Sequence, residues 1–245
     1  MKTYSKVPNI YIDGSTLSSA DRTKYEQDIA AMLDRLLLTW AGWATLIEVY
    51  YLAKKKMTIV PYIATPENGV CNATAGAKDP QAATLKGTTL LNPNGTLPPK
   101  ENRVEGTGVG SDTTVRFSPS TWGPSTGCNT GPGANADEIL LHEMVHGVRQ
   151  MAGRSVKEAP PKGSEGLTNY EEFVAILVSN IYRSEKNIPG LRKDHAGFAQ
   201  LTAPDTDPAQ FKTKFASFLS NVGIEQQRFA NNLAQATCAF NPLRP

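Results

Sequence analysis

One segment of the chain carries residues whose types and spacing could do chemistry. His142 and His146 lie four residues apart and enclose Glu143 in the sequence HEMVH. On a helix, positions i and i+4 share one face, so both imidazoles can bind the same zinc ion. The glutamate between them can then take a proton from a water at that ion. The pattern predicts a zinc-dependent hydrolase with Glu143 as its general base.

The residues on either side of this segment predict that it lies on a buried helix. Ile139, Leu140 and Leu141 precede it, and Gly147 and Val148 follow it. Two buried histidines without a polar partner would be costly. The chain has only three histidines, and two of them form this pair. The alternative is that both merely pack and form hydrogen bonds within a core.

A catalytic zinc ion typically takes three protein ligands and leaves one position for water. Two glutamates, Glu171 and Glu172, follow on the next predicted helix. Glu171 lies three residues after Thr168, where a capping box would place its carboxylate. Glu172 shares a helix face with small residues that allow two helices to approach. We expect Glu172 to be the third ligand, although either could be an ordinary acid near a helix N-terminus.

Two further residues are candidates for a role in the reaction. His195 could be an alternative third ligand, a donor to the oxyanion that forms during hydrolysis, or a solvated loop residue. Tyr182 is a second candidate for the oxyanion donor. Together with Glu143, these two complete the predicted catalytic residues.

Caps and apolar periodicity predict the helices that position these residues. Asn135 and Glu138 have the spacing of a capping box, and the apolar run after them continues to Met151, where Gly153 can end the helix. The same spacing at Thr168 and Glu171 predicts a helix that reaches about residue 182.

Other patterns predict the rest of an α+β fold. Apolar residues at helical spacing indicate helices over 18–38, 36–53 and 208–236, and β-branched residues indicate strands over 57–63 and 113–117.

The segment Leu36–Ala53 also has the outline of a short membrane span. It is 18 residues long, contains Glu48 as its only charge, and is followed by three lysines. Its short length and its glutamate favour a buried core helix, so we do not expect a membrane partner.

Composition limits the class of protein. A chain of 245 residues with 40% hydrophobic residues can form one globular domain. A net charge of +2 gives no reason to expect a nucleic acid partner. Residues 64–134 hold 11 of the 20 glycines and 8 of the 17 prolines, which indicates loops and hairpins between an N-terminal part, 1–63, and a helical part, 135–245.

The cysteines and the first residues of the chain indicate how many disulfides can form and by which route the protein could be exported. Cys71, Cys128 and Cys238 lie far apart, so at most one disulfide can form and one thiol is left over. The first residues lack the apolar core of a Sec signal peptide, so we expect export, if it occurs, by a route that cleaves no such peptide or as part of a larger chain.

The chain resembles the NleD-like effector zinc metallopeptidases of bacterial secretion systems. The likeness rests on LLHEMVHGVRQMAG (Leu140 to Gly153), on EEFVAILVSNIYRSEKNIPGLRKDHAGF (Glu171 to Phe198) and on RFSPSTW (Arg116 to Trp122). The family's paired glutamates, its Asn-x-x-[Tyr/Phe]-Arg stretch and its Arg-x-x-His-Gly-like end have counterparts at Glu171, Glu172, Ala175, Asn180, Tyr182, Arg183, Arg192 and His195. One residue is inserted between His195 and Gly197.

This resemblance implies a zincin fold and a zinc endopeptidase that is delivered into a target cell as an effector or toxin. It implies a protein or peptide substrate there, and it raises the possibility of a secretion-system carrier and an immunity protein as partners. We expect a single domain with a small, mostly antiparallel sheet packed on several helices. The strand at 113–117 is the expected edge that binds extended substrate. The alternatives are a metal-stabilised binding module, with its fourth zinc position closed, and a membrane-acting toxin.

Overall fold

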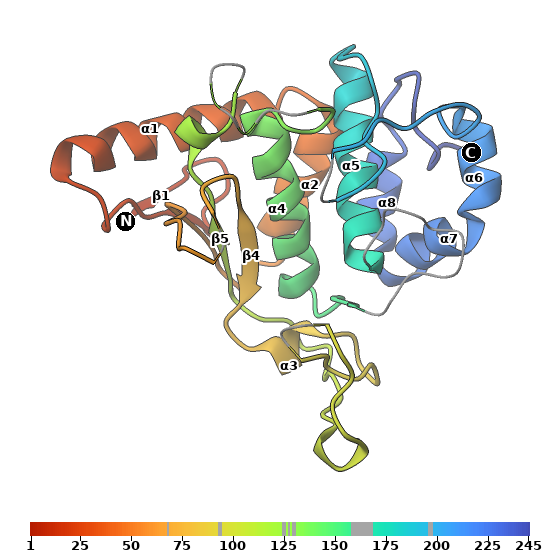
Figure 1. The fold of residues 1–245 in the computed structure, drawn as a ribbon, viewed down its shortest axis with the longest axis horizontal. Helices are drawn as coiled ribbons and strands as arrows, with labels where there is room; N and C mark the ends of the chain where they lie inside the picture. Colours follow the sequence, from red (N-terminus) through yellow and green to blue (C-terminus); the bar gives the residue numbers. More distant parts are fainter. Residues whose placement is uncertain are drawn as a thin grey trace.

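The computed structural model describes residues 1–67, 69–92, 95–123, 126, 128, 131–157, 169–195 and 198–245. Within these residues, eight α-helices pack with a five-stranded sheet (Figure 1). The predicted α+β class is therefore confirmed.

The sheet is mixed. Its strands, in spatial order, are β1 (Lys2–Thr3), β2 (Ile10–Ile12), β3 (Met57–Val60), β5 (Thr113–Arg116) and β4 (Thr74–Ala77). The three central strands run parallel, and β1 and β4 are antiparallel edge strands. The expectation of a mostly antiparallel sheet is wrong because helical crossovers, such as the pair of helices between β2 and β3, make parallel neighbours possible.

The position of β5 corrects a second expectation. This strand pairs with β3 on one side and β4 on the other, so it is not an edge. The exposed edge belongs to β4, whose sequence TAGA has small residues and no pattern typical of a strand. Pairing with β5, rather than local propensity, makes it a strand.

Two helices fill the connection from β2 to β3. The first, α1 (Ser19–Leu36), buries Ile29, Met32 and Leu33 on one face, as its periodicity predicts. The second, α2 (Trp40–Tyr51), begins at the N-cap Thr39 and is shorter than the predicted segment. Among the described helices, none combines the length and apolar character that crossing a membrane requires.

The central helix pair is α4 (Ala136–Met151) and α5 (Tyr170–Glu185), and α4 lies between the sheet and α5 (Figure 1). The capping box of Asn135 and Glu138 is present, and α4 ends before Gly153 at a positive φ of 67°. The predicted cap Thr168 lies outside the described residues. Asn169 is the N-cap of α5, and its side chain accepts from the Glu172 amide.

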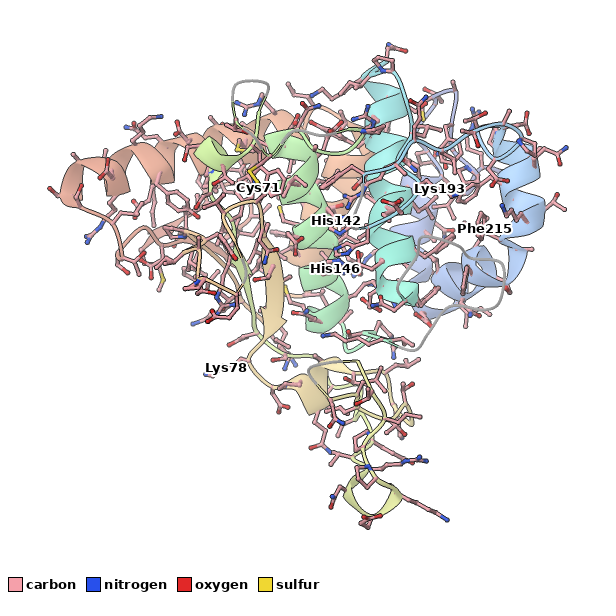
Figure 2. All side chains as sticks on the ribbon, in the orientation of Figure 1. Cys71, Lys78, His142, His146, Lys193 and Phe215 are labelled. Atoms are coloured by element: carbon pink, nitrogen blue, oxygen red, sulfur yellow. A yellow bond between two sulfur atoms is a disulfide. The ribbon has the colours of Figure 1, made fainter. Side chains whose placement is uncertain are left out.

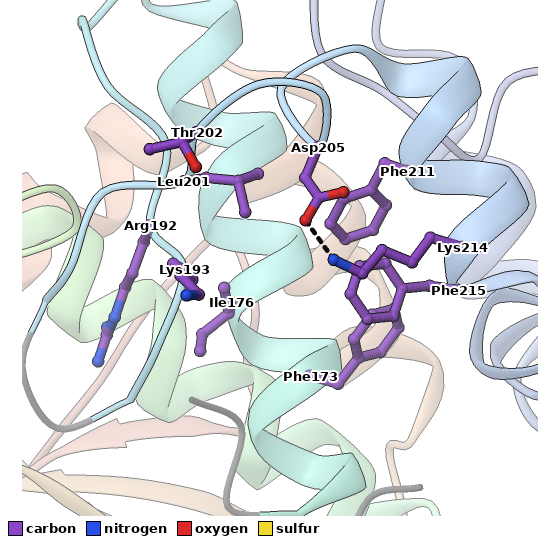
Figure 3. Close-up of a pocket in the computed structure, with 10 residues that line it drawn as sticks. All are labelled: Phe173, Ile176, Arg192, Lys193, Leu201, Thr202, Asp205, Phe211, Lys214 and Phe215. Atoms are coloured by element: carbon purple, nitrogen blue, oxygen red, sulfur yellow. Dashed lines mark hydrogen bonds and ion pairs between the residues drawn. The ribbon is translucent and has the colours of Figure 1, made fainter. Parts of the chain in front are cut away.

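The C-terminal part differs from the single helix predicted over 208–236. It consists of α6 (Pro208–Lys214), α7 (Ala216–Glu225) and α8 (Gln227–Leu233). The turns between them let phenylalanines pack on α5. The ring centroid of Phe173 lies 4.8 Å from that of Phe218 and 5.4 Å from that of Phe215. Figure 3 shows Phe173 and Phe215 beside a cavity. Aromatic burial therefore outweighs the continuation of a helix.

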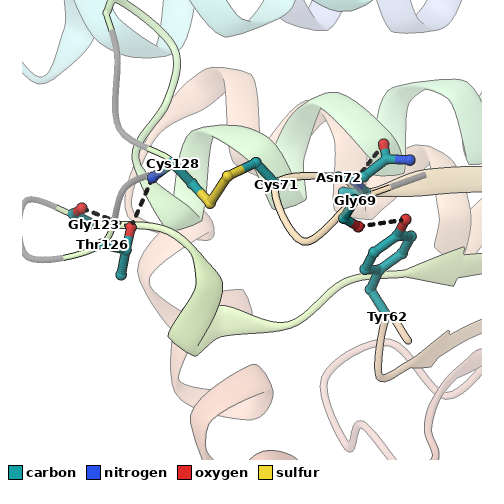
Figure 4. The surroundings of a disulfide bond; sticks show 8 residues. Tyr62, Gly69, Cys71, Asn72, Gly123, Thr126 and Cys128 are labelled. Carbon is teal, nitrogen blue, oxygen red and sulfur yellow. Dashed lines mark hydrogen bonds between the residues drawn. A yellow bond between two sulfur atoms is a disulfide. The ribbon is translucent and has the colours of Figure 1, made fainter. Parts of the chain in front are cut away.

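In the described part of the glycine-rich and proline-rich segment, the elements besides β4 and β5 are short. These are α3 (Pro80–Ala83) and the 3-10 turns η1 (Lys100–Asn102) and η2 (Pro119–Thr121). A disulfide joins Cys71 to Cys128 within this segment (Figure 4), whereas the thiol of Cys238 is free. One bond and one thiol agree with the cysteine count.

Candidate metal centre

Four side chains from three elements meet at one point. His142 and His146 project from α4 toward α5 (Figure 2), Glu172 comes from the first turn of α5, and His195 comes from the loop that follows. The Glu172 carboxylate lies 3.1 Å from His142 Nε2, 3.5 Å from His146 Nε2 and 3.4 Å from His195 Nε2. The two ligand candidates of α4 are 3.1 Å apart at their Nε2 atoms.

These distances fit a zinc ion. A tetrahedral ion with bonds of ~2.0–2.1 Å has neighbouring ligand atoms ~3.3–3.4 Å apart. The contacts at this cluster, between 3.1 and 3.5 Å, are close to that spacing. The ligand atoms of His142, Glu172 and His195 all lie within 4.8 Å of one another. Imidazole nitrogen and carboxylate oxygen are ligands that zinc accepts, so this cluster could hold a metal ion.

Burial and charge set the protonation of the cluster. Burial lowers the pKa of His142 to about 3, which leaves a neutral ring able to bind a cation. Burial acts in the same direction on His146, but the Glu172 carboxylate outweighs it and raises the pKa of His146 to about 9. Burial raises the pKa of Glu172, but the nearby His146 and His142 outweigh this effect and hold that pKa well below its usual range. A cation would compete with the proton that His146 carries.

Glu143 lies beside the cluster on α4. Burial, with Glu172 nearby, raises the pKa of its carboxyl to about 7, against the effect of His146 and Arg192. The side chain lines a cleft together with His146 and Glu172. A buried carboxyl with a pKa near neutrality suits a group that takes and returns protons.

The neighbouring Glu171 has a different environment. Its carboxylate accepts from Arg149 Nε at 2.9 Å and from the Val156 amide at 2.7 Å. Arg149 is fully buried and also donates to Glu225 at 3.0 Å. Glu171 thus pairs with a buried arginine, and that pair fixes the end of α4 to the start of α5. Its predicted capping partner, Thr168, lies outside the described residues.

The structure does not bring Tyr182 to this cluster. Its hydroxyl donates to Asp137 Oδ2 at 2.6 Å, at the start of α4. Ten residues separate it from Glu172 on the same helix, a rise of about 15 Å. We therefore assign Tyr182 to the packing of α5 on α4 and not to the oxyanion.

A cleft of about 600 Å³ runs over the cluster. It is lined by Thr74 and Ala75 from β4, Glu143 and His146 from α4, Glu172 from α5, and His195. A smaller space of about 180 Å³, here called the side cavity, adjoins it. Both share Asn72, Ala73, Glu143 and His195 as lining residues.

Two lining residues of the side cavity, Trp122 and Arg192, have no signal in the sequence that marks them as part of a site. They are distant from the HEMVH segment in the chain, and only packing brings them to His142. The family resemblance includes both residues, but neither residue has a type or spacing that predicts chemistry from the sequence alone.

Comparison of the chain with models of known protein families found no match. Searches against curated protein sequences and against solved structures also found none. The function is therefore inferred from the geometry of the cluster and the cleft.

Proposed function

We propose that this chain is a zinc-dependent endopeptidase with a zincin-like fold. One observation carries the proposal: His142, His146 and Glu172 converge at ligand spacing beside a cleft that Glu143 also lines. A catalytic zinc site has three protein ligands and a fourth position that water or substrate can reach. A carboxylic acid next to the ligands can serve as the general base.

The residues of the chain divide the reaction among them. Zinc, when bound by His142, His146 and Glu172, supplies a Lewis acid that lowers the pKa of a water from ~15.7 toward ~7. Glu143 takes a proton from the attacking water and returns it to the leaving amine. His195, whose side chain is 43% exposed at the rim, donates to the oxyanion.

Extended substrate binds along β4 in this proposal. The strand is the edge of the sheet, and it lines the cleft over Glu143 and His146. The outer edge of a sheet offers backbone N–H and C=O groups to a peptide, which gives affinity without dependence on sequence. At Ala75 the carbonyl already accepts from Gln150 Nε2 at 3.1 Å, so the peptide would pair with other groups of the edge or displace this side chain.

A second candidate function follows from the position of His195. Its Nε2 lies 3.4 Å from Glu172 Oε2, so it could occupy a fourth corner around the metal. Four protein ligands would make a closed, structural site and the chain a metal-stabilised binding module. The exposure of His195 and the cleft beside it favour the enzyme.

We further propose that the protein belongs with the NleD-like effectors, acts on a protein or peptide in a target cell, and is delivered there by a secretion-system carrier. An immunity protein would protect the producing cell if the target is bacterial. The resemblance of the two helix segments around the metal cluster supports this part of the proposal.

The peptidase is tested with Glu143→Gln, which removes the base and keeps the size of the side chain. Products from recipient-cell extract, zinc content and melting curves are compared for this variant, the unchanged protein and Glu101→Gln, an exposed control. We expect about one zinc per chain in all three and inhibition of the active proteins by phenanthroline. Turnover should fall ~10²–10⁴-fold in Glu143→Gln alone. Near-normal cleavage by Glu143→Gln with zinc bound would exclude this mechanism.

A further inference from the structure

The side cavity gathers buried donors that have no acceptor. Among the described residues, five buried side-chain nitrogens lack a hydrogen-bond partner, and three belong to residues that line this cavity. They are Trp122 Nε1, His142 Nδ1 and Arg192 Nη1. Buried polar groups are nearly always paired in folded proteins, so three unpaired nitrogens on residues that line one cavity indicate a missing acceptor.

Two of the three atoms are donors in every state, because an indole nitrogen and a guanidinium nitrogen can only donate. The third, His142 Nδ1, carries the proton of the neutral ring when Nε2 binds the metal of the proposed site. The group that completes this cavity must therefore accept hydrogen bonds.

The charge of Arg192 narrows the chemistry of the acceptor. The residue is 2% exposed, and its guanidinium donates to the backbone carbonyls of Asp194 and His195. Four carboxylates, those of Glu172, Glu143, Asp194 and Glu138, attract its charge, but among the described residues no hydrogen bond joins its guanidinium to a carboxylate. Its Cζ atom also lies 4.2 Å from the centre of the Phe198 ring. These contacts hold Nη1 in place, and a buried positive charge favours a negatively charged partner.

The walls and the position of the cavity indicate how the anion arrives. Trp122, Ile139 and Phe198 give it apolar walls, and Glu143 and His195 are shared with the cleft. A volume of about 180 Å³ suits one side chain. The cavity in Figure 3 also has Arg192 in its wall, but there the cation of Lys214 already pairs with Asp205.

We propose that the side cavity is a specificity pocket for an acidic side chain, Asp or Glu, of the substrate. This inference rests on the proposed peptidase. The methylene groups of the substrate residue contact Trp122 and Phe198, and its carboxylate accepts from Arg192 and the Trp122 indole. The chain then cleaves next to an acidic residue.

The first test compares cleavage of amidated peptide pairs that differ only in Glu against Gln near the cleaved bond. A hydrogen bond between charged groups predicts a preference for Glu of roughly 10- to 100-fold in kcat/KM. Trp122→Phe removes one donor and keeps the ring, and Arg192→Met removes the charge. Both should reduce the preference, Arg192→Met to about twofold, whereas the half-buried Trp43→Phe in α2 should keep it. Equal cleavage of the pairs, or a preference unchanged in both variants, overturns the proposal.

The second test needs no turnover. The chain has three tryptophans, so the indole N–H signal of Trp122 can be assigned in an NMR spectrum by its loss in Trp122→Phe. We expect N-acetyl-glutamate α-amide to shift this signal and N-acetyl-glutaminamide to leave it unchanged. A shift with N-acetyl-leucine alone would mean that the cavity binds a chain terminus, and would overturn the side-chain assignment. A shift with the glutamate probe, in a protein that cleaves nothing, keeps the pocket and rejects the peptidase.

Discussion

Glu171 and Glu172 are adjacent in the chain, but their side chains leave α5 about 100° apart and enter different environments. Glu172 faces three histidines, and Glu171 faces Arg149. One carboxylate can therefore serve the metal while its neighbour fixes the two helices that carry the ligands.

This division predicts opposite effects for two substitutions. Glu172→Ala should weaken zinc binding strongly, because it removes one of three ligands. Glu171→Ala leaves the buried Arg149 with Glu225 as its remaining carboxylate. The free energy of unfolding should therefore fall by up to about 3–5 kcal/mol. Zinc titration and urea unfolding of both variants measure these effects. If Glu171→Ala lowers zinc affinity more than Glu172→Ala, the assignment is wrong.

His195 separates the enzyme from the structural metal site. If it donates to the oxyanion, His195→Ala should retain zinc and lose roughly 10²–10³-fold in kcat. If it is a fourth ligand, the same change should lower zinc affinity instead. Zinc content after dialysis, measured beside the cleavage rate, distinguishes these outcomes, and His146→Ala is the control that should lose both metal and activity.

At the scale of elements, the junction of α1 and α2 depends on a close approach of backbone. A Cβ added at Gly42 would lie 2.1 Å from the carbonyl oxygen of Leu36. This approach lets α2 turn sharply after α1 and then pack against α4 and α5. The helix pair that carries the metal cluster is supported on one side by this junction.

Gly42→Ala should therefore destabilise the protein by roughly 1–3 kcal/mol or more, because backbone must move. Gly223→Ala is the matched control in α7, where an added Cβ meets no atom within 4 Å. There the gain in helix propensity should stabilise by about 0.5–1 kcal/mol. Urea midpoints of the two variants should move in opposite directions, and a shared direction would contradict this account of the junction.

At the scale of the whole molecule, the disulfide ties a wall of the side cavity to a distant part of the chain. Cys71 lines the side cavity just before β4, and Cys128 precedes α4 (Figure 4). The bond closes a loop between residues 57 positions apart. It therefore restrains both the unfolded chain and this wall of the side cavity.

Loss of this bond should cost up to about 4 kcal/mol by chain entropy. Cys71→Ser, or treatment with a reductant, should lower the melting temperature. Either change should also reduce cleavage, because the segment just before β4 is no longer anchored to Cys128. Cys238→Ser removes the free thiol and should change neither the melting temperature nor its response to reductant. A melting curve of the unchanged protein that reductant does not shift would show that the bond contributes little.

The sequence by itself determined the features that depend on neighbours within one or two helical turns. The pair His142 and His146, the capping box at Asn135 and the buried face of α1 follow from helical spacing and local hydrogen bonds. The α+β class follows from the same patterns. These predictions hold because their causes lie inside the segments that they describe.

Only the tertiary structure decided the features whose partners are far away in the chain. β4 became the edge by pairing with β5, and the aromatic cluster on Phe173 divided the C-terminal helix into three. Arg149 fixed the role of Glu171, and packing brought Arg192 and Trp122 to the side cavity. Burial makes these contacts strong, and burial is set by the whole fold rather than by the spacing of residues in the sequence.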